Sequence, residues 1–132
     1  MSIRKISRVI LLVVLSSIAA GSKTFTVPTD IKTIQDCIDK AEEGDTVFVK
    51  KGIYREQLTL KDNVSLIGES ATETILRGAG YGVMVTGADN ALISGFTIEN
   101  GNVGIRCSNV IPIIENVVVR SNKETGIHCI IA

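Results

Sequence analysis

The sequence predicts an all-β chain wound as a parallel β-helix, in which the short strands of successive coils stack on one another. Apart from one helical segment, apolar residues alternate with polar ones in short runs separated by Gly, Asn and Asp, as in half-buried strands. The phrase "GIRC" at Gly104–Cys107 recurs as "GIHC" at Gly126–Cys129, 22 residues later. Self-similarity at this period predicts a solenoid, because each copy is the same strand on the next coil, about 4.8 Å away.

Residues 1–22 have the three-part pattern of a secretory signal peptide. Arg4, Lys5 and Arg8 give a basic start, an apolar run spans Val9–Leu15, and small residues follow. This run is too short to cross about 30 Å of hydrocarbon as a helix. We therefore expect residues 23–132 to be exported to the periplasm, the cell surface or the medium, with no membrane contact after cleavage.

The exported part is short enough to form one domain at most. The formal net charge of the chain is zero, which gives no reason to expect nucleic acid as a partner. Cys37, Cys107 and Cys129 lack the spacing of a metal site, so we expect neither a metal nor another cofactor. If the repeat stacks Cys107 on Cys129, the two form either a disulfide or a ladder of free buried thiols.

A short amphipathic helix is predicted to cap the N-terminal end of the solenoid, after a strand and a turn in residues 24–33. Its apolar residues at helical spacing are Ile34, Cys37, Ile38 and Ala41. Thr33 is suited to the N-cap with Asp36 three residues on, as in a capping box. Gly44 suits a left-handed helix exit.

The remaining apolar runs predict the strands and their register. The runs with period two contain Val47 and Val49, Leu58 and Leu60, Val64 and Leu66, Ile75, Val83 and Val85, Phe96 and Ile98, and Val117 and Val119. Val83 and Val85 match Ile105 and Cys107 at 22 residues, and Phe96 matches Val117 at 21. We expect these matched residues to point into the core.

Stacking of the copies also predicts which polar residues point outward. Arg106 and His128 fall in one outward column on adjacent coils. Glu99 and Arg120 are expected to stack outside as an ion pair, worth about 0.2–1 kcal/mol at an exposed site.

The segment from Thr33 to Gly78 closely resembles the opening of right-handed parallel β-helix proteins of the pectin-lyase-like superfamily. It reads "TIQDCIDKAEEGDTVFVKKGIYREQLTLKDNVSLIGESATETILRG", and "SGFTIENGNVGIRC" resembles their generic coil. The resemblance covers about Phe25–Ala132 and implies a right-handed β-helix. It says little about activity, because the superfamily includes pectate lyases, pectinesterases, polygalacturonases, adhesins and periplasmic copper-maturation proteins.

The catalytic residues of the pectinesterases, which share this opening most visibly, do not carry over. Val103 and Gly104 stand where those enzymes have a Gln, and "KETGIHC" lacks their Gln-Asp pair. The sequence also lacks the clustered carboxylates that would hold the calcium of a pectate lyase.

Candidate sites each have a functional and a structural interpretation. Arg106 and His128 are the candidate catalytic or groove-lining pair, since His can serve as a general base, or they are ordinary surface residues. Tyr54 and Glu56 belong to the shared opening, where we expect Tyr54 to pack and Glu56 to bond backbone at the first turn. The polar residues Asp89, Asn90 and Asn102 suit turns better than a calcium shell.

Two functions follow from the resemblance. The first is an exported protein that binds or processes pectin-like polysaccharide, with its catalytic coils absent from this chain; the complete enzyme would be a polysaccharide lyase, glycoside hydrolase or pectinesterase. The second is a non-catalytic surface or periplasmic scaffold, of the adhesin or copper-enzyme maturation type. Because "GIHCIIA" leaves an apolar terminal coil open, we expect either a longer protein or end-to-end association with a second copy.

Overall fold

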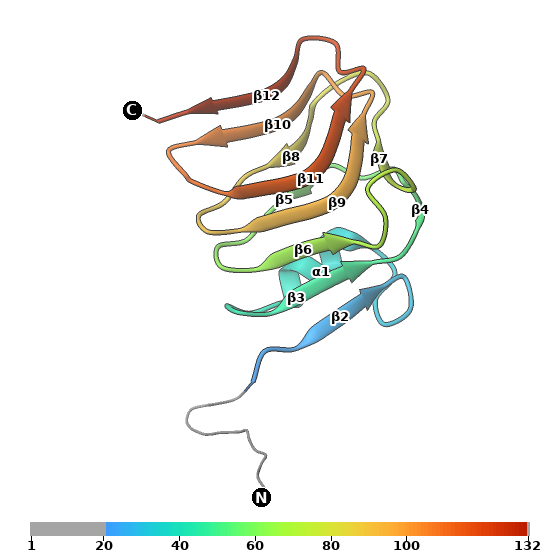
Figure 1. The fold of residues 1–132 in the computed structure, drawn as a ribbon, viewed down its shortest axis with the longest axis vertical. Helices are drawn as coiled ribbons and strands as arrows, with labels where there is room; N and C mark the ends of the chain where they lie inside the picture. The colour runs from blue at the N-terminus through green and yellow to red at the C-terminus, as the bar shows by residue number, and fades with distance from the viewer. Residues whose placement is uncertain (1–20, 132) are drawn as a thin grey trace, which may run out of the picture.

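The computed structural model describes residues 21–131. They form a parallel β-solenoid of about five turns, stacked from the N-terminal end to the C-terminal end (Figure 1). The coils lie about 22 residues apart, as the repeat predicts. The predicted signal peptide falls on residues 1–22, of which 1–20 lie outside the described part.

Each full coil has three faces, and every strand pair is parallel. The first face contains β2 (Thr24–Val27), β3 (Thr46–Val49), β6 (Ser65–Gly68) and the first halves of β9 (Leu92–Glu99) and β11 (Ile113–Arg120). The second face contains β4 (Gly52–Tyr54), β7 (Thr74–Arg77) and the second halves of β9 and β11. The third face contains β5 (Leu58–Thr59), β8 (Val83–Thr86), β10 (Val103–Ser108) and β12 (Thr125–Ile130). In Figure 1, β9 and β11 turn from the first face to the second as continuous bent strands.

Two of the predicted register matches are confirmed. Val117 in β11 pairs with Phe96 in β9, 21 residues earlier. Cys129 in β12 pairs with Cys107 in β10, 22 residues earlier. Phe96 and Cys107 are buried, whereas Cys129 is exposed because β12 is the last strand of the third face among the described residues.

The predicted match of Val83 and Val85 with Ile105 and Cys107 is wrong by two residues. Val85 pairs with Ile105, at an offset of 20. Cys107 instead lies over Gly87, where an added Cβ would be 3.0 Å from its Sγ. This coil is two residues shorter than the next one: residues 83–91 precede β9 where 103–112 precede β11, and the following corners are residues 100–102 and 121–124. Strand alternation has period two, so it fits offsets of 20 and 22 equally well.

The capping helix α1 (Ile34–Lys40) forms where it was predicted, but its end differs. The Thr33 hydroxyl accepts the N–H of Asp36 at 3.1 Å, which confirms the N-cap. Gly44 does not end the helix: Ala41 is already extended, and Gly44, at φ +91°, lies in the turn before β3. The Lys61 ammonium bonds the Ala41 carbonyl at 2.6 Å, so a cation rather than a left-handed residue satisfies this terminus.

The helix also protects the free edge of the third face. The side-chain amide of Gln35 accepts the Thr59 N–H at 2.9 Å and donates to the Thr59 carbonyl at 3.2 Å. It takes the place that a neighbouring strand would have on β5. Such protection keeps an edge strand from pairing with another chain.

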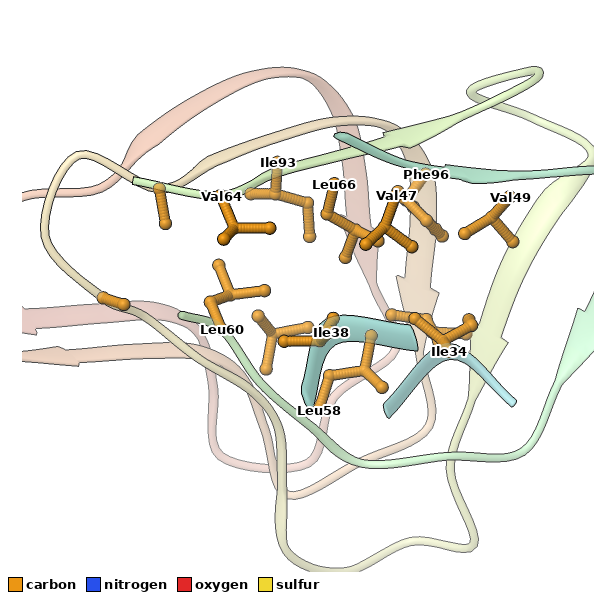
Figure 2. Packing of buried hydrophobic residues seen from close by; sticks show 14 of the residues in the cluster. Ile34, Ile38, Val47, Val49, Leu58, Leu60, Val64, Leu66, Ile93 and Phe96 are labelled. Carbon is orange, nitrogen blue, oxygen red and sulfur yellow. The ribbon is translucent and has the colours of Figure 1, made fainter. Parts of the chain in front are cut away.

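The core lies between the three faces and is almost entirely apolar. Figure 2 shows Ile34 and Ile38 of the helix facing Val47 and Leu66 of the first face. Phe96 is among the largest side chains with no solvent exposure.

The corners between faces need special backbone conformations. Gly95 has φ +79°, and it lies so close to Gly68 on the preceding coil that a Cβ on either residue would overlap the other's carbonyl oxygen. Further corner residues with left-handed backbone are Asn63, Asn90, Asn100, Asn109, Asn116 and Ser121. The amides of Asn63 and Asn90 stack and bond at 2.9 Å. Asn tolerates this conformation better than most residues, as the turn composition predicts.

Candidate functional site

The third face carries the predicted pair Arg106 and His128 on adjacent strands. The two residues are in register, and Arg106 is in register with Thr86 on its other side, which in turn pairs with Thr59. All four are exposed. We name Thr59, Thr86, Arg106 and His128 the outward column. The structure thus brings the predicted pair together, on an open face of the solenoid.

On the second face, Glu99 is paired as predicted with Arg120, but it is not an exposed surface residue. Its carboxylate lies between two guanidinium groups, at 2.9 Å from Arg120 Nε and 2.6 Å from Arg77 Nε. Arg77 comes from β7 on the preceding coil, and the three residues stack in register. Because both arginines cover it, Glu99 is only 6% exposed.

The two arginines determine the charge state of Glu99. The hydrogen bond from Arg77 is the main cause that lowers the pKa of Glu99, with Arg120 adding to it against the opposing effect of burial. The carboxylate is therefore ionised throughout the neutral range and fixes the direction of both guanidinium groups.

Beside this triad, a cleft of about 270 Å³ opens at the corner between the second and third faces. It is lined by residues 55–57 from the β4–β5 connection, and by Arg77, Gly78, Ala79 and Tyr81 from the end of β7 and the β7–β8 connection. We name it the arginine cleft, after Arg55 and Arg77.

Hydrogen bonds hold the walls of the arginine cleft in place. The Gln57 amide donates to the Tyr81 carbonyl at 3.1 Å, which ties the two connections together. This bridge requires Gly82, because an added Cβ there would overlap the Gln57 amide. Glu56 bonds the backbone N–H groups of Ile34 and Gln35 at 3.0 and 3.1 Å, at the first turn of the helix.

Tyr54 and the turn residues have structural partners. The Tyr54 hydroxyl donates to the Lys50 carbonyl at 2.7 Å, and the ring packs against the core. The Asp89 carboxylate accepts the Ile111 N–H at 2.8 Å, and the Asn102 amide donates to Glu124 at 3.0 Å. These contacts are those of turns between coils.

Within residues 21–131, no group of three or more His, Cys, Asp and Glu side chains is placed to hold a metal ion. In the same range, no helix has both the length and the apolar character needed to cross a membrane. No protein-family model matches the sequence, and no curated protein or solved structure is significantly similar to it.

The arginine cleft was not found from the sequence. Arg55 directly follows β4, and Arg77, 22 residues later, is the last residue of β7. The two strands pair with each other. The repeat period would have stacked them, but β4 has only three residues, which are too few for alternation in the sequence to mark it as a strand.

Proposed function

We propose that this chain is part of an exported, right-handed β-helix protein of the pectin-lyase-like type that binds polysaccharide across its third face. The resemblance of residues 33–78 to the opening of that superfamily supports the family and the handedness. The export proposal is supported by the pattern of residues 1–22 alone.

The observation that carries the binding proposal is the outward column. Its residues are exposed on neighbouring parallel strands, so their polar groups repeat about every 4.8 Å along the solenoid axis. A sugar chain lying along that axis would meet a hydroxyl, a guanidinium or an imidazole on each coil it crosses.

The same column favours binding over cleavage by these residues. Glycosidases use two carboxyl groups on opposite sides of the scissile bond. The outward column has none, and the carboxylates of Glu56 and Glu99 bond helix N–H groups and arginines. We expect the chain to release neither reducing ends nor methanol from pectin above a heat-killed control.

Affinity electrophoresis of the exported chain in gels containing polygalacturonate, methyl-esterified pectin or neutral galactan tests the proposal. We expect at least one polymer to retard the chain, and Arg106→Ala to weaken that retardation about tenfold, as for loss of a charged hydrogen bond. Lys50→Ala, which removes an exposed cation near the β3–β4 corner, is the control. Retardation by no polymer would overturn the proposal.

A non-catalytic scaffold is the second candidate. The observation that favours it is the corner chemistry: the stacked amides of Asn63 and Asn90 bond each other and so support the solenoid itself. A scaffold whose surface has no carbohydrate role would migrate unchanged in every gel.

A further inference from the structure

The arginine cleft has the size and rigidity of a small-ligand site. Its volume of about 270 Å³ lies near the lower end of the range for ligand pockets, which suits one sugar-sized group rather than an extended ligand. The Gln57–Tyr81 hydrogen bond fixes one connection against the other. A site held open in this way loses little entropy when a ligand enters.

The charges around the cleft favour an anion. Both nearby carboxylates are directed to internal partners: Glu56 to the N-terminus of α1, and Glu99 to Arg77 and Arg120. Arg55 is exposed and has no ion pair within the described part of the chain.

A further cation stands at the rim. Lys123 lies against Gly80 in the β7–β8 connection, with its ammonium 3.8 Å from the position of an added Cβ. Its positive charge adds to that of Arg55 and of the two arginines that share Glu99. These four cations outnumber the carboxylates of Glu56 and Glu99 by two, so the surroundings of the cleft keep a net positive charge.

Arg77 is oriented for planar recognition. Its Nε–H is held by Glu99 at 2.6 Å, so the guanidinium is fixed while its terminal nitrogens keep N–H donors for a ligand. A fixed guanidinium matches the two oxygens of a carboxylate in a bidentate pair.

The rim offers a surface for a sugar ring. The Tyr81 side chain is exposed, with the residue at 62%, and gives an aromatic face with a polar end at the mouth of the cleft. The Gln57 side-chain oxygen adds an acceptor for a hydroxyl group.

We propose that the arginine cleft binds the carboxylate of a sugar acid, with Arg55 and Arg77 on the carboxylate and Tyr81 against the ring. That the ligand is a sugar rests on the proposed polysaccharide-binding function. That it carries a negative charge rests on the cleft itself. It places an acid-selective subsite at the corner beside the outward column.

The test is an NMR titration of the full exported chain with a trisaccharide of galacturonic acid and, separately, with its neutral methyl ester. We expect the acid to shift the amide signals of residues 55–57 and 77–81, and the ester to bind at least about tenfold more weakly. Arg55→Gln should weaken binding of the acid about tenfold, since it removes a charge-assisted contact. Lys50→Gln should not, and thermal melts check that both variants are folded.

Equal binding of acid and ester, or full affinity in Arg55→Gln, would overturn the inference. Inorganic phosphate binding as tightly as the acid would also overturn it, because the cleft would then be a general anion site. Retardation by a polymer without shifts at the cleft would leave the proposed function standing and refute the subsite. Shifts at the cleft without retardation by any polymer would refute the proposed function and leave the subsite standing.

Discussion

At the scale of single residues, Glu99 is the clearest case of a polar group that burial makes dependent on its partners. A buried carboxylate is costly unless it is paired and hydrogen-bonded, and here two arginines from the coils on either side satisfy it. The two ion pairs also hold neighbouring coils in register, since Arg77, Glu99 and Arg120 occupy equivalent positions on successive coils.

Replacing Glu99 should therefore destabilise the protein in a pH-dependent way. Glu99→Gln leaves two guanidinium groups facing each other without an anion. We expect a loss of about 2 kcal/mol at neutral pH, less than for a fully buried pair because both arginines reach solvent. Urea unfolding measures it, with the exposed Glu115→Gln on β11 as the control, expected to stay within about 0.5 kcal/mol of the parent.

The sign of the pH dependence follows from the lowered pKa of Glu99. A carboxyl whose pKa is lower in the folded state stabilises the protein above its unfolded value of about 4.5, and this stabilisation is lost as the pH falls through the folded pKa. The difference between the parent and Glu99→Gln should thus narrow below pH 4.5. Asp45, whose pKa is lowered by the N–H groups of Lys23 and Glu42, is present in both proteins and cancels. A difference that stays constant down to acid unfolding would show that Glu99 is not held ionised by the arginines.

At the scale of elements, the corners determine whether strands can stack. β6 and β9 lie close together where Gly68 meets Gly95, and the backbone there leaves no room for a side chain. The corner glycine is therefore a packing requirement as well as a conformational one.

Gly68→Ala should destabilise the protein strongly, because the added Cβ overlaps the Gly95 carbonyl, which is backbone and cannot rotate away. We expect a loss of about 3 kcal/mol or more, measured by thermal or urea unfolding. Gly126→Ala is the matched control: its Cβ would meet Val119 at an ordinary 3.5 Å, so a change within about 0.5 kcal/mol is expected. Equal effects of the two substitutions would contradict the close approach.

At the scale of the whole molecule, the coils are joined by parallel strand pairing and a continuous apolar core. The three cysteines come from different parts of the stack: Cys37 from the helix, Cys107 from β10 and Cys129 from β12. All three are free thiols in the structure, although Cys107 and Cys129 are in register.

Thiol reactivity distinguishes the free ladder from a disulfide. Burial is the main cause that raises the pKa of Cys107 to about 12 and that of Cys37 to about 11, so neither forms the reactive thiolate at pH 8. We expect iodoacetamide to modify exposed Cys129 rapidly in the folded protein, and all three thiols only after denaturation. Mass spectrometry of the labelled chain measures this. Labelling of Cys37 alone in denaturant without reductant would show that the other two form a disulfide.

The sequence by itself determined most of the strands, although not β4, together with the capping helix and the stacking of β9 under β11 and of β10 under β12. These features depend on alternation, on helical spacing around Ile34, and on a repeat whose phrases are nearly identical. Local patterns record such features because each concerns residues close in sequence or a copy of the same segment.

Only the tertiary structure decided the offset of β8 against β10, the end of the helix at Lys61, and the addition of Arg77 to the predicted pair of Glu99 and Arg120. A shift of two residues keeps every side chain on its own face, so alternation cannot set the offset, and strand and corner lengths do so instead. The arginine cleft belongs to the same class. Its residues follow short or irregular segments, and they meet because the coils stack, which brings together chemistry that no local pattern in the chain records.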